Sequence, residues 1–449
     1  MTETELYYSG GAGNRTKIEV LDVTGGLPDD PENYYAVIRM KNLPDFYAGI
    51  REFRRENGSR ADGSAGRNSN AGADSGRVYA VLDQENMVLY GEDGTRSQEY
   101  AFPVAYRDGQ GEYPLIKSAE ELFRQMADNP KGKFELSEDL DASGLSDSAA
   151  AVAGTFTGEL DGNGYRIRNL PTSIFATLSG AHIHDLVIEN AQITAQRSGI
   201  LANVIQNRTV VERVFIIDST VSNSVDELGT FAGKLLNSTI RESAASDVSV
   251  KGLVAVGGLV GRTESGALIE NCYVTGKVQG TYDHPSLGAR VGGAVGWHGG
   301  GTISRCYTQA QIIAPARKGN GGIIGGPNTG SPSIEYTLSM SSGAGYRIAG
   351  FDVLDGVKEV YEYSGSESVT SITDNSRDNV KETDRIYESG FYEEVLGFDG
   401  DIWDLDLADH GKRPNLKNAP VDENKYNIPD YSALRRKAGY RVEREKIYA

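Results

Sequence analysis

Two interleaved motifs recur along this chain, and their shared period constrains the fold more than any other feature. The first motif begins with glycine and occurs as GILANV, GTFAGK, GGLVGR, GGAVGW and GGIIGG, starting at residues 199, 229, 257, 292 and 321. The second motif has an apolar anchor at Ile183, Val211, Ile240, Ile269, Ile303 and Ile334. Both series advance by about 29 residues at a time. Two independent motifs with one period indicate a repeat architecture.

The repeat units favour strands over helices. They are short and rich in β-branched residues, and glycine interrupts them before a helix could form. No repeat carries the apolar period of about 3.6 residues that marks an amphipathic helix. We therefore predict an all-β chain built around a right-handed parallel β-helix of about seven coils, in which equivalent residues stack about 4.8 Å apart.

Aligning the repeats assigns residues to columns along this β-helix. One column is entirely apolar and is predicted to face the interior: Leu201, Phe231, Leu259, Ala294 and Ile323. The column two residues later contains only Asn and Gly, which tolerate positive φ, so we predict a left-handed structural corner at Asn203, Gly233, Gly261, Gly296 and Gly325. Cys272 and Cys306 share one interior position on adjacent coils. Their parallel Cβ directions favour two buried free thiols over a disulfide.

Three columns are predicted to point outward. Two of these columns are charged: one runs from His184 through Glu212 and Arg241, and the other from Asp185 through Arg213 and Glu242. Their charges often alternate in sign between coils, which is typical of a solvated face that fixes the register. The third column is apolar although it points outward, and an exposed apolar stripe usually marks an interface. We expect another domain to cover it, and its candidate interface residues are Val187, Phe215, Tyr273, Tyr307 and Leu338.

Composition excludes several classes of protein. The formal net charge of −18 argues against a nucleic-acid partner. Two cysteines in 449 residues exclude a small disulfide-stapled fold. No apolar stretch reaches the length of about 20 residues that a membrane span needs. The run NGSRADGSAGRNSNAGADSG (57–76) contains no large apolar residue and is predicted to be a flexible loop.

The regions around the repeats suggest further domains. We expect a small β domain over 1–112, a capping helix and lead-in strand over 113–150, and the parallel β-helix over 151–350. A C-terminal cap would follow over 351–430, and a helical segment over 431–449. Ser118 and Glu121 form a capping box, which predicts that a short helix begins there.

The repeats and the segments before them resemble a known family. GGLVGR-type repeats resemble the GLUG motif of bacterial surface proteins. LFRQMADNPKGKFELSEDLDASGL (122–145) and FTGELDGNGYRIRNLPTSIFATLSGAHIHDLVIENAQI (156–193) resemble the non-catalytic region N-terminal to the protease domain of M26 zinc metallopeptidases, the family of streptococcal IgA1-specific proteases. ALRRKAGYRVEREKIYA resembles the helical segment that leads into that domain. The resemblance implies an extracellular, secreted or cell-surface location and zinc-dependent endopeptidase activity in the parent protein.

That activity does not transfer to this chain. The family's zinc site uses HExxH, in which two histidines one helical turn apart bind the metal. None of the five histidines is followed by Glu-x-x-His: His182, His184, His284, His298 and His410. We therefore expect no catalytic residue, metal ligand or cofactor here, and zinc only in the parent's absent protease domain. The expected partners are that protease domain and a large protein substrate, with immunoglobulin A as one candidate.

Three functions remain as hypotheses. The leading one is a non-catalytic scaffold and substrate-docking region of an M26-type metalloendopeptidase. The second is a carbohydrate-active β-helix enzyme, a lyase or hydrolase that uses clustered carboxylates. The third is an adhesin rod that binds host protein or glycan through the apolar column.

A few polar residues could carry other chemistry. His182 and His184 could share a metal on one strand, but the sequence shows no third ligand, and surface histidines are the favoured interpretation. Asp161, Asp218 and Asp247 lie at predicted bends, where turn-forming aspartate is the ordinary role. The acidic run DGDIWDLD (399–406) is a weak candidate for calcium binding.

Overall fold

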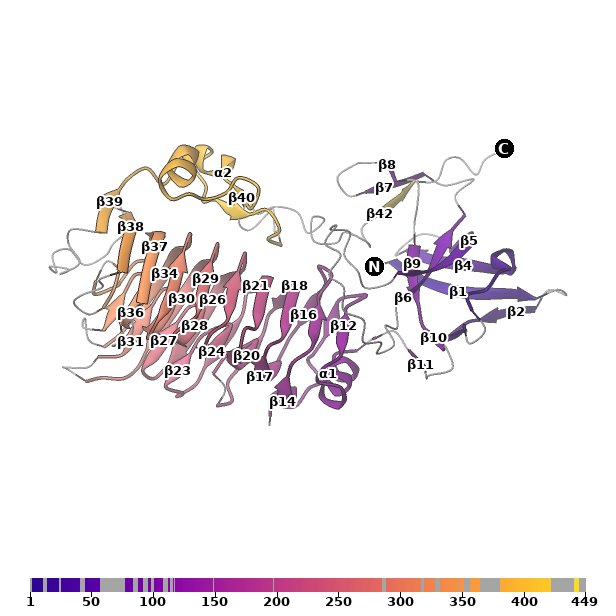
Figure 1. The fold of residues 1–449 in the computed structure, drawn as a ribbon, viewed down its shortest axis with the longest axis horizontal. Helices are drawn as coiled ribbons and strands as arrows, with labels where there is room; N and C mark the ends of the chain where they lie inside the picture. Colours follow the sequence, from indigo (N-terminus) through magenta and orange to yellow (C-terminus); the bar gives the residue numbers. More distant parts are fainter. Residues whose placement is uncertain are drawn as a thin grey trace, which may run out of the picture. The chain divides into compact units, whose positions relative to one another are not determined.

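The computed structural model shows a chain that is mostly β and divides into two compact units (Figure 1). One unit comprises Met1–Ile116 and Arg435–Ala449, and the other Lys117–Leu434. The structure describes residues 2–420 and 440–443 except 11–13, 24–25, 41–44, 57–76, 84–87, 92–95, 98–100, 108–111, 114–115, 117, 148, 197, 285–287, 316–318, 328–331, 347, 351–355 and 364–379. The predicted loop at 57–76 therefore lies outside the described residues. Among the described helices, none is long and apolar enough to cross a membrane.

The first unit is built around an antiparallel sheet with strand order β2-β1-β4-β5-β6-β9. Its strands are β1 (Thr2–Gly10), β2 (Asn14–Lys17), β4 (Tyr34–Met40), β5 (Phe46–Glu56), β6 (Arg77–Leu82) and β9 (Ala101–Val104), and a short 3₁₀ helix η1 (Pro31–Asn33) precedes β4. One face of this sheet buries a core that includes Leu6, Ile38, Ile50 and Val78.

Two small sheets complete this unit. One contains β3 (Leu21–Asp22), β10 (Tyr106–Arg107) and β11 (Glu112–Tyr113). The other contains β7 (Val88–Gly91), β8 (Arg96–Ser97) and β42 (Tyr440–Glu443). The prediction of a helix over 431–449 is wrong for β42, which pairs antiparallel with β7, and the rest of that segment lies outside the described residues. Backbone pairing with β7 overrides the local helix preference of this charged sequence.

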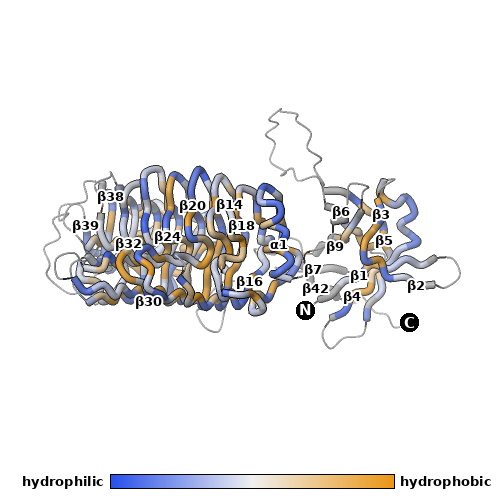
Figure 2. The backbone as a smooth tube through the Cα atoms, turned by 90° about the horizontal axis from the view of Figure 1, so that it is seen from below, coloured by the Kyte–Doolittle hydropathy of each residue, from blue (hydrophilic) through white to orange (hydrophobic). Residues whose placement is uncertain are grey.

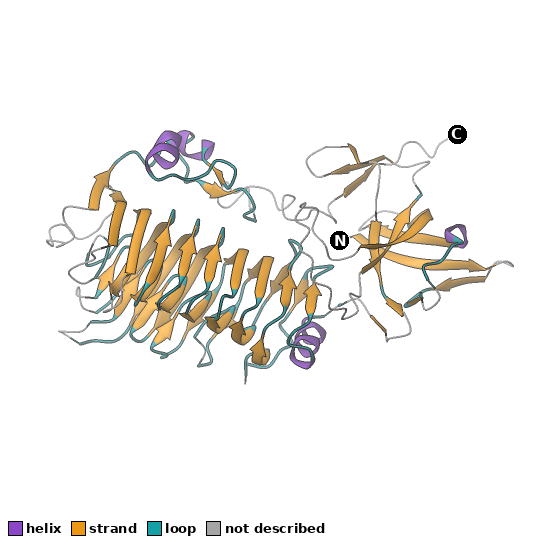
Figure 3. Ribbon diagram, viewed as in Figure 1, coloured by secondary structure: helices purple, strands orange, loops and turns teal. Residues whose placement is uncertain are grey.

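The second unit begins with helix α1 (Ala119–Asp128), which the capping box predicted. The Ser118 hydroxyl accepts a hydrogen bond from the Glu121 backbone N–H at 3.1 Å, which satisfies one of the free donors at the helix start. Leu122, Phe123 and Met126 are buried on one face of the helix, which packs against β14. Figure 3 shows that helix is scarce in this unit and that strands make up most of it.

Three parallel sheets form the main part of the second unit. A seven-stranded sheet contains β14 (Val152–Phe156), β17 (Phe175–Ser179), β20 (Ala202–Gln206), β24 (Ala232–Leu235), β28 (Val260–Thr263), β32 (Val295–His298) and β36 (Ile324–Pro327). A four-stranded sheet contains β23 (Glu227–Leu228), β27 (Ala255–Gly257), β31 (Arg290–Gly292) and β35 (Asn320–Gly321).

The largest sheet has seventeen described strands. They are β12 (Lys133–Glu135), β13 (Leu140–Asp141), β15 (Glu159–Asp161), β16 (Arg166–Arg168), β18 (His182–Glu189), β19 (Gln192–Ile193), β21 (Val210–Ile217), β22 (Thr220–Ser222), β25 (Thr239–Arg241), β26 (Ala244–Gly252), β29 (Leu268–Glu270), β30 (Tyr273–Gly280), β33 (Gly301–Ser304), β34 (Tyr307–Ile313), β37 (Pro332–Ser339), β38 (Gly356–Tyr363) and β39 (Val380–Thr383). Parallel pairing thus begins before residue 151 and continues beyond residue 350.

The strand register follows the repeat that the sequence shows. Each anchor of the second motif pairs with the next, from Ile183 with Val211 to Ile303 with Ile334, and all six are fully buried. The first motif also stacks in register, from Ala202 with Ala232 to Val295 with Ile324. The chain therefore passes once through the sheets in each repeat and returns to pair beside itself, so hydrophobic positions recur from coil to coil (Figure 2).

The predicted left-handed corner is wrong. Neither Asn203 nor Gly233, Gly261, Gly296 or Gly325 has positive φ. The glycines are needed because the backbone of a neighbouring strand is too close for a side chain: a Cβ on Gly261 would lie 2.3 Å from the Leu228 nitrogen. Close packing and left-handed backbone both favour glycine, so the sequence alone does not distinguish them.

The actual left-handed positions lie elsewhere. Asp185, Arg213, Glu242, Asn271 and Arg305 have φ between 49° and 51°. The first three belong to one outward charged column, and Asn271 and Arg305 occupy the same position on the next two coils. Each of these left-handed residues comes directly after a residue of the other charged column, which begins at His184. The chain therefore bends between the two charged columns on every coil. A second left-handed column contains small or amide residues: Gly180, Asn207, Asn237 and Gly266. Cys272 and Cys306 are buried free thiols.

Candidate functional site

A segment near the C-terminus, residues 384–420, folds against the coils, and we call it the cap segment. It contains a π-helical turn η2 (Phe391–Val395), the short helix α2 (Asp406–Asp409) and the antiparallel pair β40 (Trp403–Asp404) and β41 (Asn415–Leu416). This segment lies within the stretch 351–430 that is predicted to form a C-terminal cap, and β40 and β41 are its two described strands. The segment lies along the side of the coils, over the largest sheet (Figure 1).

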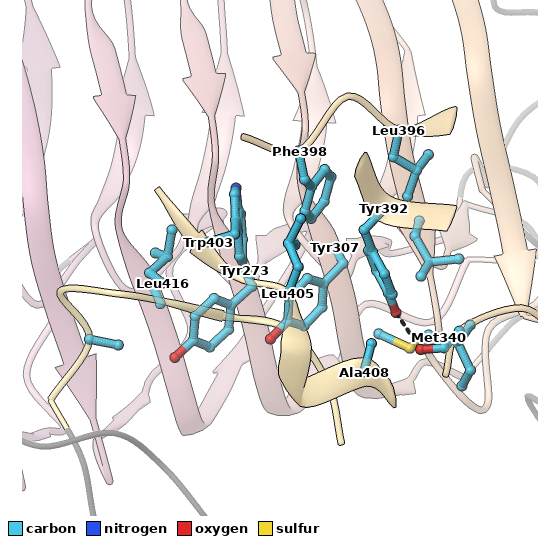
Figure 4. Packing of buried hydrophobic residues seen from close by; sticks show 14 of the residues in the cluster. Tyr273, Tyr307, Met340, Tyr392, Leu396, Phe398, Trp403, Leu405, Ala408 and Leu416 are labelled. Atoms are coloured by element: carbon cyan, nitrogen blue, oxygen red, sulfur yellow. Dashed lines mark hydrogen bonds between the residues drawn. The ribbon is translucent and has the colours of Figure 1, made fainter. Parts of the chain in front are cut away.

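The cap segment covers the outward apolar column. Val187, Phe215, Tyr273, Tyr307 and Leu338 are at most 6% exposed, and they share one hydrophobic cluster with cap residues. The cap contributes Ile386, Phe391, Tyr392, Leu396, Phe398, Trp403, Leu405, Ala408, Leu416 and Ala419 to this cluster (Figure 4). The apolar face predicted to be covered is therefore buried by a later segment of the same chain.

Aromatic rings form the centre of this contact. Tyr273 and Tyr307 stack on adjacent coils with their ring centroids 5.0 Å apart. The Trp403 ring lies 5.8 Å from the Tyr307 ring and 4.6 Å from the Phe398 ring. Aromatic pairs at such separations contribute about 0.5–1.5 kcal/mol beyond the area that they bury.

Hydrogen bonds fix the cap segment in one position. The Trp403 indole Nε1–H donates to Asn271 Oδ1 at 3.2 Å, and the Tyr307 hydroxyl donates to the Pro414 carbonyl at 2.9 Å. Burial raises the pKa of Tyr307 to about 12, so this hydroxyl stays protonated and able to donate at neutral pH. The Arg305 Nε–H donates to the Gly397 carbonyl at 3.1 Å. Asn271 and Arg305 are left-handed bend residues of the coils, and Tyr307 belongs to the apolar column.

This burial corrects one hypothesis about the apolar column. An adhesin that binds a partner through the column would need exposed side chains, but these side chains are covered. The aromatic residues of FYEEVLGFDGDIWDL are a signal in the sequence for the segment that covers the column. That stretch lacks the repeat period, so its docking position could not be derived from spacing.

A second site lies on the outer face of the first coils. Strands β15 and β18 pair in parallel, so that Glu159 lies beside His182 and Asp161 beside His184. On the next coil, Glu212 of β21 lies beside His184. The two histidines have no third ligand that is visible in the sequence, and the fold brings carboxylates to them from both neighbouring coils.

The two imidazoles are held by these carboxylates. The His184 Nδ1–H donates to Asp185 at 2.8 Å, and the His184 Nε2 lies 3.3 Å from Glu159 Oε1. The His182 Nε2–H donates to Glu212 at 3.0 Å, and the two imidazole ring centroids are 4.3 Å apart. We call Glu159, His182 and His184, with Asp185 and Glu212, the histidine cluster.

Electrostatics in the histidine cluster favour positive charge on His184. Burial alone lowers the pKa of His184, but hydrogen bonds to Asp185 and Glu159 outweigh burial and raise it to about 9. The hydrogen bond from His184 in turn lowers the pKa of Glu159 to about 2. Burial tends to raise the pKa of Asp185, but hydrogen bonds from Arg213 at 2.7 and 2.8 Å hold it well below its usual range. The hydrogen bond with His182 similarly lowers the pKa of Glu212.

The aspartates at predicted bends form turns. Asp218 and Asp247 have φ of 49° and 53°. Asp161 accepts a hydrogen bond from the Asn163 backbone N–H at 2.7 Å, as in an Asx turn, and its carboxylate lies 3.6 Å from His184 Nδ1. In the cap segment, Asp399 likewise accepts from the Asp401 backbone N–H at 2.8 Å.

Comparison with known proteins shows which families parts of the chain resemble. Residues 69–217 match the family profile of the M26 IgA1-specific metallo-endopeptidase N-terminal region, and residues 252–279 match that of the GLUG motif. These two stretches are therefore similar to the N-terminal region of M26 metallo-endopeptidases and to the GLUG motif, and the resemblance seen in the sequence is confirmed.

The similar proteins are much longer than this chain. Immunoglobulin A1 protease from Streptococcus pneumoniae serotype 4 (strain TIGR4) is 22% identical over 395 residues, which cover 78% of this chain and 19% of the relative. Zinc metalloprotease ZmpC from the same strain is 24% identical over 320 residues, covering 61% of this chain and 16% of the relative. A solved structure of an IgA1 protease aligns with a TM-score of 0.46 and 19% identity, covering 83% of this chain and 29% of the other. The chain thus spans about a fifth or less of the curated relatives' length.

Proposed function

We propose that this chain is the non-catalytic scaffold and substrate-docking region of a secreted or surface-attached bacterial zinc metalloendopeptidase of the M26 family. The observation that carries the proposal is the continuous stack of parallel coils, closed along one side by the cap segment. A stack with a filled apolar interior and a fixed register suits a rigid support for a neighbouring domain.

The sequence supports the non-catalytic part of the proposal. None of the five histidines belongs to an HExxH motif, which the zinc chemistry of this family needs. The relatives named above are a metalloprotease and an immunoglobulin A1 protease, and this chain corresponds to a minor part of each. Zinc for catalysis would then belong to the parent's protease domain.

We infer that the coils of the second unit form a right-handed parallel β-helix, since crossovers between parallel strands are right-handed in about 98% of cases. The compact unit that contains Met1–Ile116 supports a separate small β domain before it. A crystal structure of the chain that showed left-handed coils would refute this inference.

The proposed function is tested by binding and cleavage measured on the same protein. Immobilised chain is exposed to human immunoglobulin A1, with immunoglobulin G as the control ligand, and binding is followed by surface plasmon resonance. In parallel, the chain and immunoglobulin A1 are incubated with zinc, and the products are separated on a gel. We expect selective binding and no cleavage. Cleavage by this chain would contradict the non-catalytic role, and failure to bind would reduce the role to that of a spacer.

A further inference from the structure

We propose that Glu159, His182 and His184 form a binding site for one divalent transition-metal cation, with Zn²⁺ as the cation that these ligands fit best. This site would be separate from the catalytic zinc of the parent's protease domain and goes beyond the proposed function. Two imidazoles and one carboxylate are a ligand set that zinc accepts, with a fourth position left for water.

The fold places the three ligands together through strand pairing. Glu159 is the direct neighbour of His182 across the β15–β18 pair, and His184 is the next outward residue on the same strand. One ligand atom from each of the three side chains lies within 4.8 Å of those of the other two. Because the register of two parallel strands fixes these positions, the arrangement does not depend on a loop.

The distances suit a tetrahedral ion. Zinc–nitrogen and zinc–oxygen bonds of about 2.1 Å at tetrahedral angles put neighbouring ligand atoms about 3.4 Å apart. His184 Nε2 and Glu159 Oε1 are already 3.3 Å apart. Bringing all three ligands to this spacing needs shifts of at most about 1.4 Å. The His182 side chain is 28% exposed, which leaves it room to make such a shift.

Groups behind the ligands orient His184 as a metal-binding histidine is usually oriented. Its Nδ1–H donates to Asp185, which leaves Nε2 pointing toward Glu159. Asp185 is held in turn by two hydrogen bonds from Arg213. A carboxylate behind the imidazole fixes the ring and strengthens it as a ligand, and such partners are the rule in zinc sites.

The charge around the ligands also suits a cation. Four carboxylates face the two imidazoles: those of Glu159, Asp161, Asp185 and Glu212. Lys133 pairs with the second oxygen of Glu159, Oε2, while Arg213 and Arg241 pair with Asp185 and Glu212. A bound metal would take the place of the proton on His184 Nε2 and leave its hydrogen bond to Asp185 in place.

The test uses the chain as it stands, titrated with zinc chloride by isothermal calorimetry and with Co²⁺ by visible absorption. We expect one zinc per chain, and Co²⁺ absorption bands of the intensity typical of a tetrahedral site. The variants His182→Gln and Glu159→Gln should each weaken zinc binding at least tenfold. His410→Gln is the matched control, because His410 lies in the cap segment and bonds to the Asp406 carbonyl.

Circular dichroism confirms that the variants are folded, so a lost signal reports a lost ligand. Since His182 and Glu159 are partly exposed, their replacement should leave the fold intact. The proposal is overturned if the chain binds no zinc, if His182→Gln binds it as tightly as the unchanged chain, or if His410→Gln removes the binding.

Discussion

Replacing Trp403 with alanine should release the cap segment from the coils. The indole is completely buried, and it contacts Phe398 and the stacked Tyr273 and Tyr307 rings. A buried aromatic side chain removes about 150–250 Å² from water, which at about 25 cal/mol per Å² is an upper limit of about 4–6 kcal/mol. Measured Trp→Ala costs in protein cores are about 3–5 kcal/mol. The variant Trp403→Ala should therefore lose about 3–5 kcal/mol at this contact.

The hydrogen bond to Asn271 can be tested separately from the packing. Trp403→Phe keeps most of the ring contact but removes the Nε1–H that donates to Asn271 Oδ1. Asn271 is buried, so its amide oxygen would be left without this donor at a cost of about 1–3 kcal/mol. Tyr387→Ala is the control, because Tyr387 lies in the cap segment but is 50% exposed, and its loss should cost less than about 0.5 kcal/mol.

Hydrogen–deuterium exchange measures this loss locally. The cap segment can open without unfolding the coils, since cooperative units of a protein open with different free energies. In Trp403→Ala we expect faster exchange throughout the cap segment and unchanged exchange in the buried strands β20 and β24. If the cap exchanges at the same rate in Trp403→Ala and in the unchanged chain, the aromatic cluster does not hold the cap and this reasoning is wrong.

Other substitutions and conditions test the coils themselves. Gly261→Ala would place a Cβ 2.3 Å from the Leu228 nitrogen and should destabilise the chain by about 1–3 kcal/mol in urea unfolding. The control is Gly154→Ala, whose Cβ would have nothing within 4 Å and which should change the free energy of unfolding by less than about 0.5 kcal/mol. Equal effects of the two substitutions would argue against close packing at Gly261. Burial lowers the pKa of His298 to about 4, so the unfolded chain takes up this proton below pH about 6.5 and the folded chain only near pH 4. The free energy of unfolding should thus fall by about 3 kcal/mol more between pH 7 and pH 4 in the unchanged chain than in His298→Gln, and parallel pH profiles would contradict this. Cys272 and Cys306 are both buried, and burial raises the pKa of the Cys272 thiol. Iodoacetamide should therefore label neither cysteine until the chain is unfolded. Rapid labelling of the folded chain would show that the thiols are accessible.

The sequence predicted the strand register because one apolar anchor per repeat is enough to align parallel strands. Ile183 and Val211 occupy equivalent places in two matching segments, and a slip of one residue would turn their side chains to the outer face. The burial of the apolar column followed from the same alignment, since alternation placed Tyr273 outward while its side chain needs cover. These inferences rest on a period that is visible in the residues.

Features without a period could not be obtained in this way. The cap segment meets the coils through pairs such as Trp403 and Asn271, which are 132 residues apart, and no spacing rule links them. Glu159 belongs to a coil whose sequence departs from the repeat, so its place beside His182 emerged only from the strand pairing. The left-handed positions were predicted at a column of glycine and asparagine, yet Arg213 and Glu242 adopt the left-handed backbone conformation. Such residues rarely adopt it, and here the stacking of the coils imposes it.

The cap segment has a consequence for how such a chain can change in length. Repeat proteins gain and lose whole units easily, because each unit contacts only its neighbours. Here the hydrophobic cluster crosses successive coils from Val187 to Leu338, and the cap contacts Asn271 and Tyr307 at two defined coils. One coil inserted between these two would move their positions apart by about 4.8 Å, and the cap could then satisfy only one of them. The contacts of the cap segment therefore restrict the number of coils between the positions that it binds. Insertions or deletions of whole repeats should be confined to coils that the cap segment does not contact.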